Sequence, residues 1–375
     1  MNKKLKIVWY AKKTPFSGNV TYSKEITNLL TAKGHEVFFF YFEKEDESEK
    51  EDKEVMLPYL YKSQAYTIPT VKSEKVIYDE LKRIKPDIVH ASLCISPIDF
   101  KLHEICHELN IPLVCTFHNA FDRRPTFHGS AAFLLYQLYA PALSKYDGMI
   151  IFSELQKEIF AKMGVPEHKI KVIPNAIDTN KFSPNSLDNP EAPIYNFNNK
   201  KIYTYLGRID AEKGVDVLIK AFLKNNFDDA VLLIVGGGKQ EKVLKSIYSE
   251  EKNIIWTGII KDEKKRINIL RNSYSFILPS QIEGLSLALL EAMSCGTACI
   301  ATDVGADGEV LAKGAGIVLN PTKVKEQLRF SLGLINENKD FRNLLAKKAR
   351  ERALESYSIE KNIEQVENLY YECLS

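Results

Sequence analysis

Short apolar runs alternate with amphipathic stretches along the first half of the chain. The runs have the length of buried strands, and the stretches between them repeat apolar residues with the period of a helix. Gly34 follows one stretch where a helix typically ends, and Pro86 ends another. We expect strands at residues 5–10, 37–42, 87–91, 112–117 and 149–152, and helices at 22–33, 71–84 and 98–109. The mainly acidic residues 43–54 are expected to form a solvated loop.

The same alternation restarts after a break. Residues 183–200 are rich in Asn, Pro and Asp without a sustained period, which is typical of a linker or surface loop. Five more strands are expected at 201–206, 231–235, 253–257, 275–278 and 298–302, and a last helix at 359–374. Strands separated by single helices pair in parallel with helices on both faces. The fold class is therefore α/β, with two Rossmann-like doubly wound domains at 1–180 and 201–355, a linker at 181–200 and a terminal helix from 356 to 375.

Composition narrows the class of protein. A net charge of +2 in 375 residues favours neither a nucleic-acid partner nor an acidic tail. No apolar run approaches the ~20 residues that cross a bilayer, and the run at 7–11 is too short for a signal peptide. Six scattered cysteines do not suggest a disulfide framework. We expect a protein of the cytoplasm or a plastid stroma-equivalent compartment, with peripheral membrane contact as an open question.

The strongest chemical signal lies after the strand at 275–278. Glu283 and Gly284 occupy a loop, and a strongly apolar helix begins near Leu285. Free N–H groups of Leu285, Ser286 and Leu287 would point at an anion there. Glu291 comes eight positions after Glu283, which is about 12 Å along a helix, too far to share one proton but suited to two ends of an extended ligand. The alternative is a capped helix with one solvent-facing and one ion-paired glutamate.

A second signal follows the strand at 201–206. Gly207 and Arg208 come directly after it, and Lys213 follows five positions later. A guanidinium offers a planar fork for phosphate oxygens and an ammonium offers a point charge. Two basic residues in a loop are also commonly just solvated. Three consecutive glycines after the next strand, at 236–238, lack the spaced dinucleotide fingerprint and are compatible with a tight turn.

The first half offers weaker candidates at equivalent places. Gly18 lies in the connection between the first strand and the first helix, the usual site of a phosphate-facing loop. His118 ends the fourth strand and should lie at the rim of the same crevice. His90 is a further candidate, and both histidines could instead serve packing or capping. All these residues fall at carboxyl ends of strands, where they can converge.

In their order along the chain, these motifs resemble those of the family 4 retaining glycosyltransferases of the GT-B fold. The resemblance covers nearly the whole chain and includes the loop at Gly18, the segment 86–90, His118, the segment 172–182, Gly207-Arg208, Lys213-Gly214 and the Glu283 to Glu291 pair. It implies two domains facing each other across a cleft, the first binding the acceptor and the second a nucleotide-sugar. The chain departs from the family pattern at Ser17, at Ala176 and in residues 303–309, which lack a proline before Glu309.

The resemblance also implies roles for single residues. Arg208 and Lys213 would hold the donor diphosphate, Glu283 the hydroxyls of the donor sugar and Glu291 the ribose. His118 would reach the sugar near the reacting carbon, and Gly18 would let the first loop close over the phosphates. Gly207, Gly284, Leu285, Ser286 and Leu287 complete the expected donor site. No metal and no other cofactor is expected, because fixed cations and helix N-termini can stabilise the leaving diphosphate.

The sequence leaves three alternatives for the acceptor and the activity. The aromatic segment 125–146, flanked by basic residues, suits a membrane interface or a buried helix on the sheet. Residues 12–22 are similar to cyanobacterial and plastid sequences related to digalactosyldiacylglycerol synthase, which would imply galactose transfer from UDP-galactose to a membrane glycolipid. A small soluble sugar or sugar phosphate is the second acceptor class. The third alternative is a non-catalytic protein that binds a nucleotide-sugar.

Overall fold

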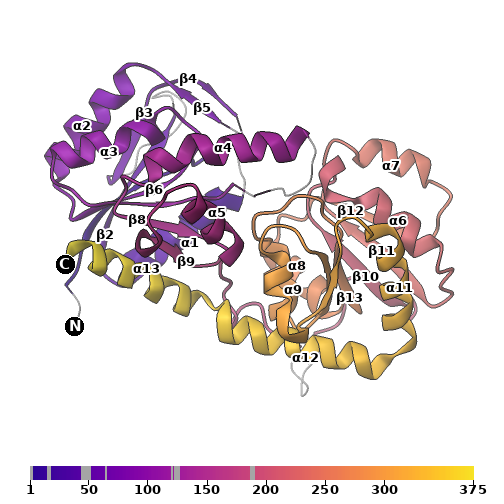
Figure 1. Ribbon diagram of the computed structural model, residues 1–375. Coiled ribbons are helices and arrows are strands. Elements are labelled where there is room, and N and C mark those ends of the chain that lie inside the picture. The colour runs from indigo at the N-terminus through magenta and orange to yellow at the C-terminus, as the bar shows by residue number, and fades with distance from the viewer. Residues whose placement is uncertain are drawn as a thin grey trace. The chain divides into compact units, whose positions relative to one another are not determined.

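The computed structural model divides the chain into two compact units (Figure 1). It describes residues 3–14, 18–43, 52–63, 66–119, 121, 127–185 and 191–375. Unit 1 comprises Met1–Pro174 and Asn362–Ser375, and unit 2 comprises Asn175–Lys361. Each unit is built around its own parallel sheet.

Unit 1 contains a seven-stranded sheet in the order β3-β2-β1-β6-β7-β8-β9. Every neighbouring pair is parallel. Because the order reverses between β1 and β6, the carboxyl ends of these two strands flank the usual ligand crevice of such a sheet. The strands are β1 (Lys6–Tyr10), β2 (Glu36–Phe42), β3 (Glu54–Leu57), β6 (Ile88–Ser92), β7 (Leu113–Thr116), β8 (Gly148–Ile151) and β9 (Ile170–Val172).

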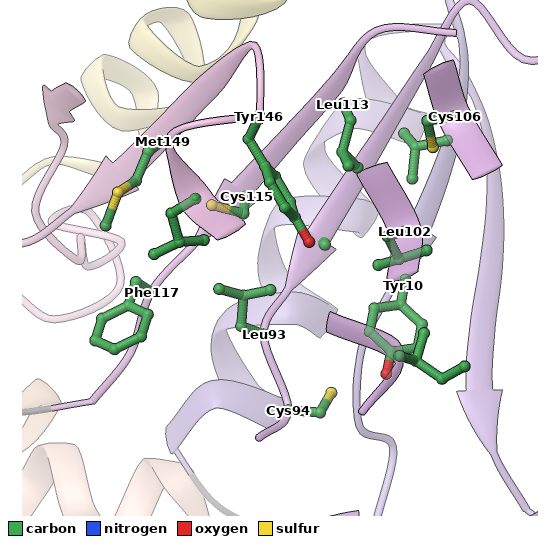
Figure 2. Close-up of a cluster of buried hydrophobic side chains, with 14 of the residues drawn as sticks. Tyr10, Leu93, Cys94, Leu102, Cys106, Leu113, Cys115, Phe117, Tyr146 and Met149 are labelled. Carbon is green, nitrogen blue, oxygen red and sulfur yellow. The ribbon is translucent and has the colours of Figure 1, made fainter. Parts of the chain in front are cut away.

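Helices cover both faces of this sheet. The helices of unit 1 are α1 (Gly18–Ala32), α2 (Lys72–Ile84), α3 (Ile98–Glu108), α4 (Phe127–Leu143), α5 (Glu154–Lys162) and most of α13 (Ile359–Leu374). Strand β6 shows the two faces by its alternation: Val89 and Ala91 join a hydrophobic cluster with α2 and α3, part of which appears in Figure 2. His90 and Ser92 point the other way, toward α13 and α1. This alternation places polar side chains beneath α1, where they matter below.

The segment expected to be an acidic loop differs from that expectation at both of its ends. Glu43 is buried and forms an ion pair with Lys62 at 2.9 Å, and Glu54 begins β3. A buried carboxylate is stable only with a partner of opposite charge, so Glu43 is not part of a solvated loop. Residues 44–51 lie outside the described part. An antiparallel hairpin that the sequence did not indicate follows, formed by β4 (Tyr59–Lys62) and β5 (Thr67–Pro69).

Helix α13 is fastened to unit 1 by polar contacts. The Tyr370 hydroxyl lies 2.6 Å from Nδ1 of His90, and Glu367 contacts both Lys33 and His35. Tyr370 is fully buried. The last residues of the chain therefore belong to the packing of the first sheet, although they are far from it in sequence.

Unit 2 contains a six-stranded parallel sheet in the order β12-β11-β10-β13-β14-β15. Numbered within the unit, this is 3-2-1-4-5-6, the Rossmann order, which reverses between β10 and β13. The strands are β10 (Lys201–Leu206), β11 (Ala230–Val235), β12 (Ile254–Gly258), β13 (Ser275–Leu278), β14 (Ala298–Thr302) and β15 (Ile317–Leu319). The helices are α6 (Val215–Leu223), α7 (Glu241–Ile247), α8 (Glu263–Arg271), α9 (Leu287–Ser294), α10 (Asp307–Val310), α11 (Val324–Glu337) and α12 (Lys339–Ser356).

Candidate active site

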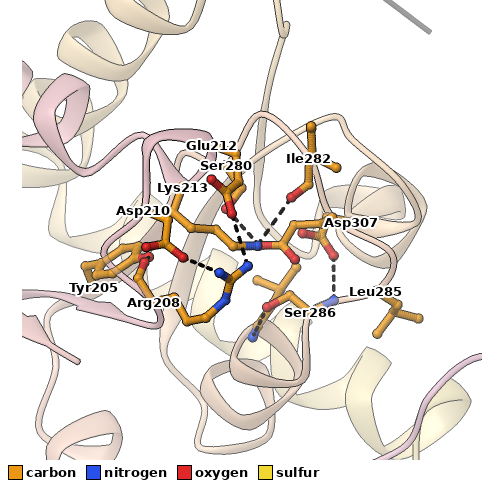
Figure 3. A network of polar contacts seen from close by, with 12 residues as sticks. Tyr205, Arg208, Asp210, Glu212, Lys213, Ser280, Ile282, Leu285, Ser286 and Asp307 are labelled. Carbon is orange, nitrogen blue, oxygen red and sulfur yellow. Dashed lines mark hydrogen bonds and ion pairs between the residues drawn. The ribbon is translucent and has the colours of Figure 1, made fainter. Parts of the chain in front are cut away.

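The two strongest sequence signals meet at the reversal point of the second sheet. Arg208 follows β10, Lys213 ends a short 3-10 helix (Ala211–Lys213), and Glu283 lies in the loop between β13 and α9. Because β10 and β13 are neighbours, the loops that leave their carboxyl ends lie against each other. Figure 3 shows the resulting network of polar side chains.

Lys213 and Glu283 are in direct contact. The Lys213 ammonium nitrogen lies 2.7 Å from Oε1 of Glu283 and donates to the carbonyl of Ile282 at 3.3 Å. The Ser280 hydroxyl donates to the same Oε1 at 2.8 Å. Both charged side chains are largely buried, with 12% and 14% of their surfaces exposed. The carboxylate of Glu283 is therefore held in one position, which suits recognition of sugar hydroxyls.

Arg208 is also paired but more accessible. Its guanidinium contacts Asp210 and lies 3.1 Å from Oε1 of Glu212, while about half of its side chain is exposed. The Tyr205 hydroxyl donates to the Arg208 carbonyl and steadies the backbone of the loop. An exposed guanidinium can exchange these carboxylates for phosphate oxygens at little cost.

Glycines are required where this loop packs on its neighbour. A Cβ on Gly236 would lie 1.8 Å from the carbonyl oxygen of Gly207, and one on Gly238 would lie 2.5 Å from that of Ile209. Gly236 also has a φ of +139°, which side chains rarely allow. The glycine run at 236–238 thus lets two stretches of backbone pack closely beside the Arg208 loop. Gly207 itself would bring a Cβ within 2.9 Å of the Tyr205 hydroxyl.

The N-terminus of α9 differs from the free anion site that the sequence predicts. Ser286 caps the helix, with its hydroxyl accepting from the N–H of Leu289 at 3.3 Å. The N–H of Ser286 is not free, because it donates to Oδ1 of Asp307 at 3.0 Å. The next loop is closely apposed, since a Cβ on Gly305 would lie 2.1 Å from the carbonyl oxygen of Glu283. A protein carboxyl group therefore occupies one of the three N–H groups expected to face the donor.

Asp307 is fully buried, and its other carboxyl oxygen has no hydrogen-bond partner within the described residues. Burial, and then the negative charge of Glu283, raise the pKa of Asp307 well above its usual range. Such a carboxyl group favours its neutral form, whose O–H can donate a hydrogen bond.

Glu291 lies on α9, eight positions after Glu283, which is in the loop before this helix. Oε1 of Glu291 is 4.0 Å from a guanidinium nitrogen of Arg266, and 13% of the Glu291 side chain is exposed. Neither glutamate of the pair faces solvent, so the alternative with one solvent-facing glutamate does not describe this site.

The unit 1 candidates differ in their surroundings. Gly18 begins α1, and a Cβ there would meet no described atom within 4 Å, so packing within the protein does not demand a glycine. Residues 15–17 lie outside the described part. His118 follows β7, with Nε2 at 2.8 Å from the hydroxyl of Ser92. Burial lowers the pKa of His118 to about 3, so its imidazole is neutral.

His90 is a structural residue. It is fully buried, stacks on Trp9 with ring centroids 3.9 Å apart, and engages Tyr370 and Thr116 through its two nitrogens. Both nitrogens are occupied by the protein, so His90 has no group left for a ligand. Packing and hydrogen bonding within unit 1, and not ligand binding, therefore explain a histidine inside this apolar strand.

Two family profiles match consecutive parts of the chain. Residues 16–181 match Glycosyltransferase Family 4, and residues 190–352 match Glycosyl transferases group 1. Together they cover both units and every residue of the candidate site. The chain belongs to the family 4 glycosyltransferases.

Relatives of this glycosyltransferase differ in the acceptor that they use. This chain is 29% identical over 314 residues to the Escherichia coli UDP-Gal:alpha-D-GlcNAc-diphosphoundecaprenol alpha-1,3-galactosyltransferase. The match covers 81% of this chain and 80% of that protein. The chain is 28% identical over 218 residues to N-acetyl-alpha-D-glucosaminyl L-malate synthase of Bacillus anthracis, covering 56% of this chain and 55% of that protein. The acceptor named is lipid-linked in the first and a small acid in the second.

Solved structures establish the GT-B fold of the glycosyltransferase. The Anabaena protein HepE in complex with UDP-glucose superposes with a TM-score of 0.75 at 13% identity, covering 98% of this chain and 100% of that one. The expected class, two Rossmann-like halves with parallel sheets, is confirmed. The chain is an enzyme that uses a nucleotide-sugar donor.

Beside the candidate residues of each unit of the glycosyltransferase lie polar residues that sequence patterns did not single out. Ser280 and Asp307 contact the Glu283 loop, and Ser92 contacts His118. One signal was available for Asp307, because it lies in residues 303–309, where the chain departs from the family pattern. The two serines carry no comparable signal, since serine is common in loops and strands alike.

Proposed function

We propose that this glycosyltransferase moves galactose from UDP-galactose to a membrane glycolipid with retention of the anomeric configuration. On the donor side, the proposal rests on the paired charges of unit 2. Lys213 and Arg208 bind the diphosphate, Glu283 binds sugar hydroxyls and Glu291 binds the ribose. Gly18, Gly207, Gly284, Leu285, Ser286 and Leu287 provide backbone close to the donor, and His118 contributes from unit 1.

The proposed reaction breaks the bond between the anomeric carbon and the diphosphate oxygen. The acceptor hydroxyl forms the new bond on the same face of the sugar, and its proton passes to the departing diphosphate. Lys213 and Arg208 are fixed cations that stabilise the charge developing on the leaving group. Glu283 is held by Lys213 and Ser280, so it is better placed to bind hydroxyls than to attack the sugar.

The proposal of a lipid acceptor rests on helix α4. Over its 17 residues it contains no Asp, Glu, Lys or Arg. Tyr136 and Tyr139 are buried against Phe117, which satisfies the expectation of a helix packed on the sheet. The opposite face exposes Phe133, Leu134 and Leu138, where a solvated helix would carry polar side chains.

A second exposed apolar group lies on the same unit. The hairpin β4–β5 and the residue Val71 just after it expose further large apolar side chains: Leu60, Tyr61, Tyr66, Ile68 and Val71. Exposed clusters of this kind mark interaction sites, and interfacial helices insert such faces at the level of the lipid headgroups. No helix in the described part of the chain is long and apolar enough to cross a bilayer. We propose that α4 and this hairpin rest on the membrane that carries the acceptor.

The test combines vesicle binding with acceptor choice. The probe is a vesicle of phosphatidylglycerol and monogalactosyldiacylglycerol, with and without added GlcNAc-diphosphoundecaprenol. We expect the protein to float with both vesicles, and Leu134→Ser/Leu138→Ser to abolish flotation while donor hydrolysis continues. Phe330→Ser is the matched control, because Phe330 is equally apolar and exposed but lies in unit 2.

Each outcome assigns an acceptor class. Label on the galactolipid supports a digalactolipid product, and label on the polyprenyl carrier supports a lipid-linked oligosaccharide. Flotation that α4 variants do not change, with transfer only to soluble sugars or sugar phosphates, would overturn the lipid proposal. Donor binding without transfer or hydrolysis would favour a non-catalytic nucleotide-sugar-binding protein.

A further inference from the structure

We propose that Ser92 is a positioning residue that, together with Ser23, fixes His118 in the neutral tautomer with its proton on Nδ1. His118 then serves the reaction as a hydrogen-bond donor to a sugar hydroxyl and not as an acid or base. The second half of this inference rests on the proposed function, which places His118 at the transferred sugar. The first half, the tautomer, depends only on unit 1.

Three side chains from three elements form the arrangement. Ser23 of α1 donates its hydroxyl to the Ser92 hydroxyl at 3.1 Å. Ser92 lies at the end of β6, and its hydroxyl oxygen is 2.8 Å from Nε2 of His118, which follows β7. Ser23 and Ser92 are both buried.

Counting protons decides the direction of the second hydrogen bond. A serine hydroxyl has one proton to donate and can accept two hydrogen bonds. The oxygen of Ser92 already accepts from Ser23, so its own proton needs an acceptor. Nε2 of His118 is the acceptor at hydrogen-bond distance. If Nε2 carried the proton instead, the proton of Ser92 would be left buried without a partner, which is unfavourable.

The ring of His118 is held as well as its tautomer. Tyr22 meets it edge-on with centroids 5.1 Å apart, and Phe152 lies 5.3 Å away. Tyr22 is itself fixed by a hydrogen bond to Thr116 at 3.3 Å. A neutral imidazole whose Nε2 accepts from the protein presents its N–H at Nδ1. The side chain is only partly buried, so this N–H can reach a ligand.

Tyr22 and Ser23 belong to α1, the helix that begins at Gly18. A movement of α1 would therefore be transmitted to His118 through Ser92.

The tautomer can be read without any activity measurement. In the full-length protein labelled with 15N-histidine, the two ring nitrogens of a neutral histidine have distinct shifts, and the signals of His118 are those that His118→Asn removes. We expect protonated Nδ1 and unprotonated Nε2 in the wild type. Ser92→Ala should shift the population toward the Nε2–H form, and Ser92→Thr, which keeps the hydroxyl, should restore the wild-type pattern. Protonated Nε2 in the wild type would overturn the inference.

The donor role is tested by a matched pair of variants. The amide nitrogen of asparagine lies where Nδ1 lies in histidine, and that of glutamine lies near Nε2. We expect His118→Asn to retain at least tenfold more kcat than His118→Gln. Ser92→Ala should lower kcat about tenfold, as expected for one weakened hydrogen bond, with the donor KM within twofold. Unfolding temperatures of all variants should be measured alongside.

The two halves fail separately. Greater activity of His118→Gln than of His118→Asn would overturn the donor role. Full activity in both variants would show that His118 has no part in transfer, and the proposed function would lose that residue. In either case the nitrogen spectrum still decides whether Ser92 fixes the tautomer.

Discussion

Lys213 and Glu283 stand 70 positions apart in the chain, and their charged groups meet at 2.7 Å. The contact joins the loops that follow β10 and β13, at the reversal point of the second sheet. It keeps a cation and the carboxylate that we propose to bind sugar hydroxyls fixed in one place before any donor arrives. Preorganised groups of this kind cost no rearrangement when the leaving group departs.

Lys213→Ala should lower kcat/KM for the nucleotide-sugar about 100-fold, because it removes a fixed cation from the leaving group. The fold should persist, since Lys213 ends a short 3-10 helix outside the sheet and Ser280 still donates to Glu283. Lys220→Ala is the control, because Lys220 forms an exposed pair with Asp216 on α6. Steady-state kinetics check the first expectation and thermal unfolding the second. Unchanged kinetics would remove Lys213 from the site.

Glu291→Ala should raise the donor KM more than it lowers kcat. A carboxylate that binds the ribose contributes equally in the ground state and in the transition state. The measurement is a donor titration at saturating acceptor. A large fall in kcat with an unchanged KM would contradict the ribose role.

Asp307→Ala should destabilise the protein by about 1–3 kcal/mol, because it leaves the N–H of Ser286 buried without an acceptor. Asp307→Asn keeps a carbonyl oxygen at that position and should be close to wild type or more stable at neutral pH. Urea unfolding of both variants separates the two cases. An equal loss in both would show that the charge of Asp307, and not its acceptor oxygen, supports the loop.

Asp99 gives a pH dependence of known sign. It is buried in unit 1, where it accepts from Tyr139 at 2.7 Å and from the N–H of Ser96 at 3.0 Å. Burial raises the pKa of Asp99 from 3.8 to about 6. Its contribution to stability is therefore fully present below pH 3.8 and is lost as the pH rises through about 6.

Asp99→Asn does not titrate, so its free energy of unfolding relative to wild type should rise between about pH 4 and pH 6 and then level off. The rise is at most about 3 kcal/mol, from about 1.4 kcal/mol for each unit of pKa. Urea unfolding of both proteins at a series of pH values gives this difference. A difference that is flat, or that falls with pH, would contradict the assignment.

The sequence predicts the sheets well because parallel strands are buried on both faces and appear as apolar runs. It fails where that signal is weak. Strands β9 and β15 have three residues each, and β3 begins inside a charged segment. The composition around Glu43 predicts a solvated side chain. Glu43 is instead buried and paired with Lys62, which lies 19 positions later in the β4–β5 hairpin.

The site shows the same division. Residue types at the ends of strands predict which groups can lie close together, since those ends converge in such folds. They do not predict which groups contact each other. That Lys213 binds Glu283, or that Asp307 takes the N–H of Ser286, depends on how separate loops pack. The sequence does not predict the contact of Ser92 with His118, because this contact depends on the pairing of β6 with β7.

We propose a nucleotide-sugar transferase that acts on a lipid through the Glu283 site. The most direct measurement is transfer of label from UDP-galactose, in parallel with UDP-glucose, to a galactolipid-containing membrane extract by the wild type and by Glu283→Ala. We predict an organic-phase product with an α linkage from the wild type, formed from UDP-galactose and absent with the variant. Label confined to water-soluble products, or equal transfer by the variant, would contradict it.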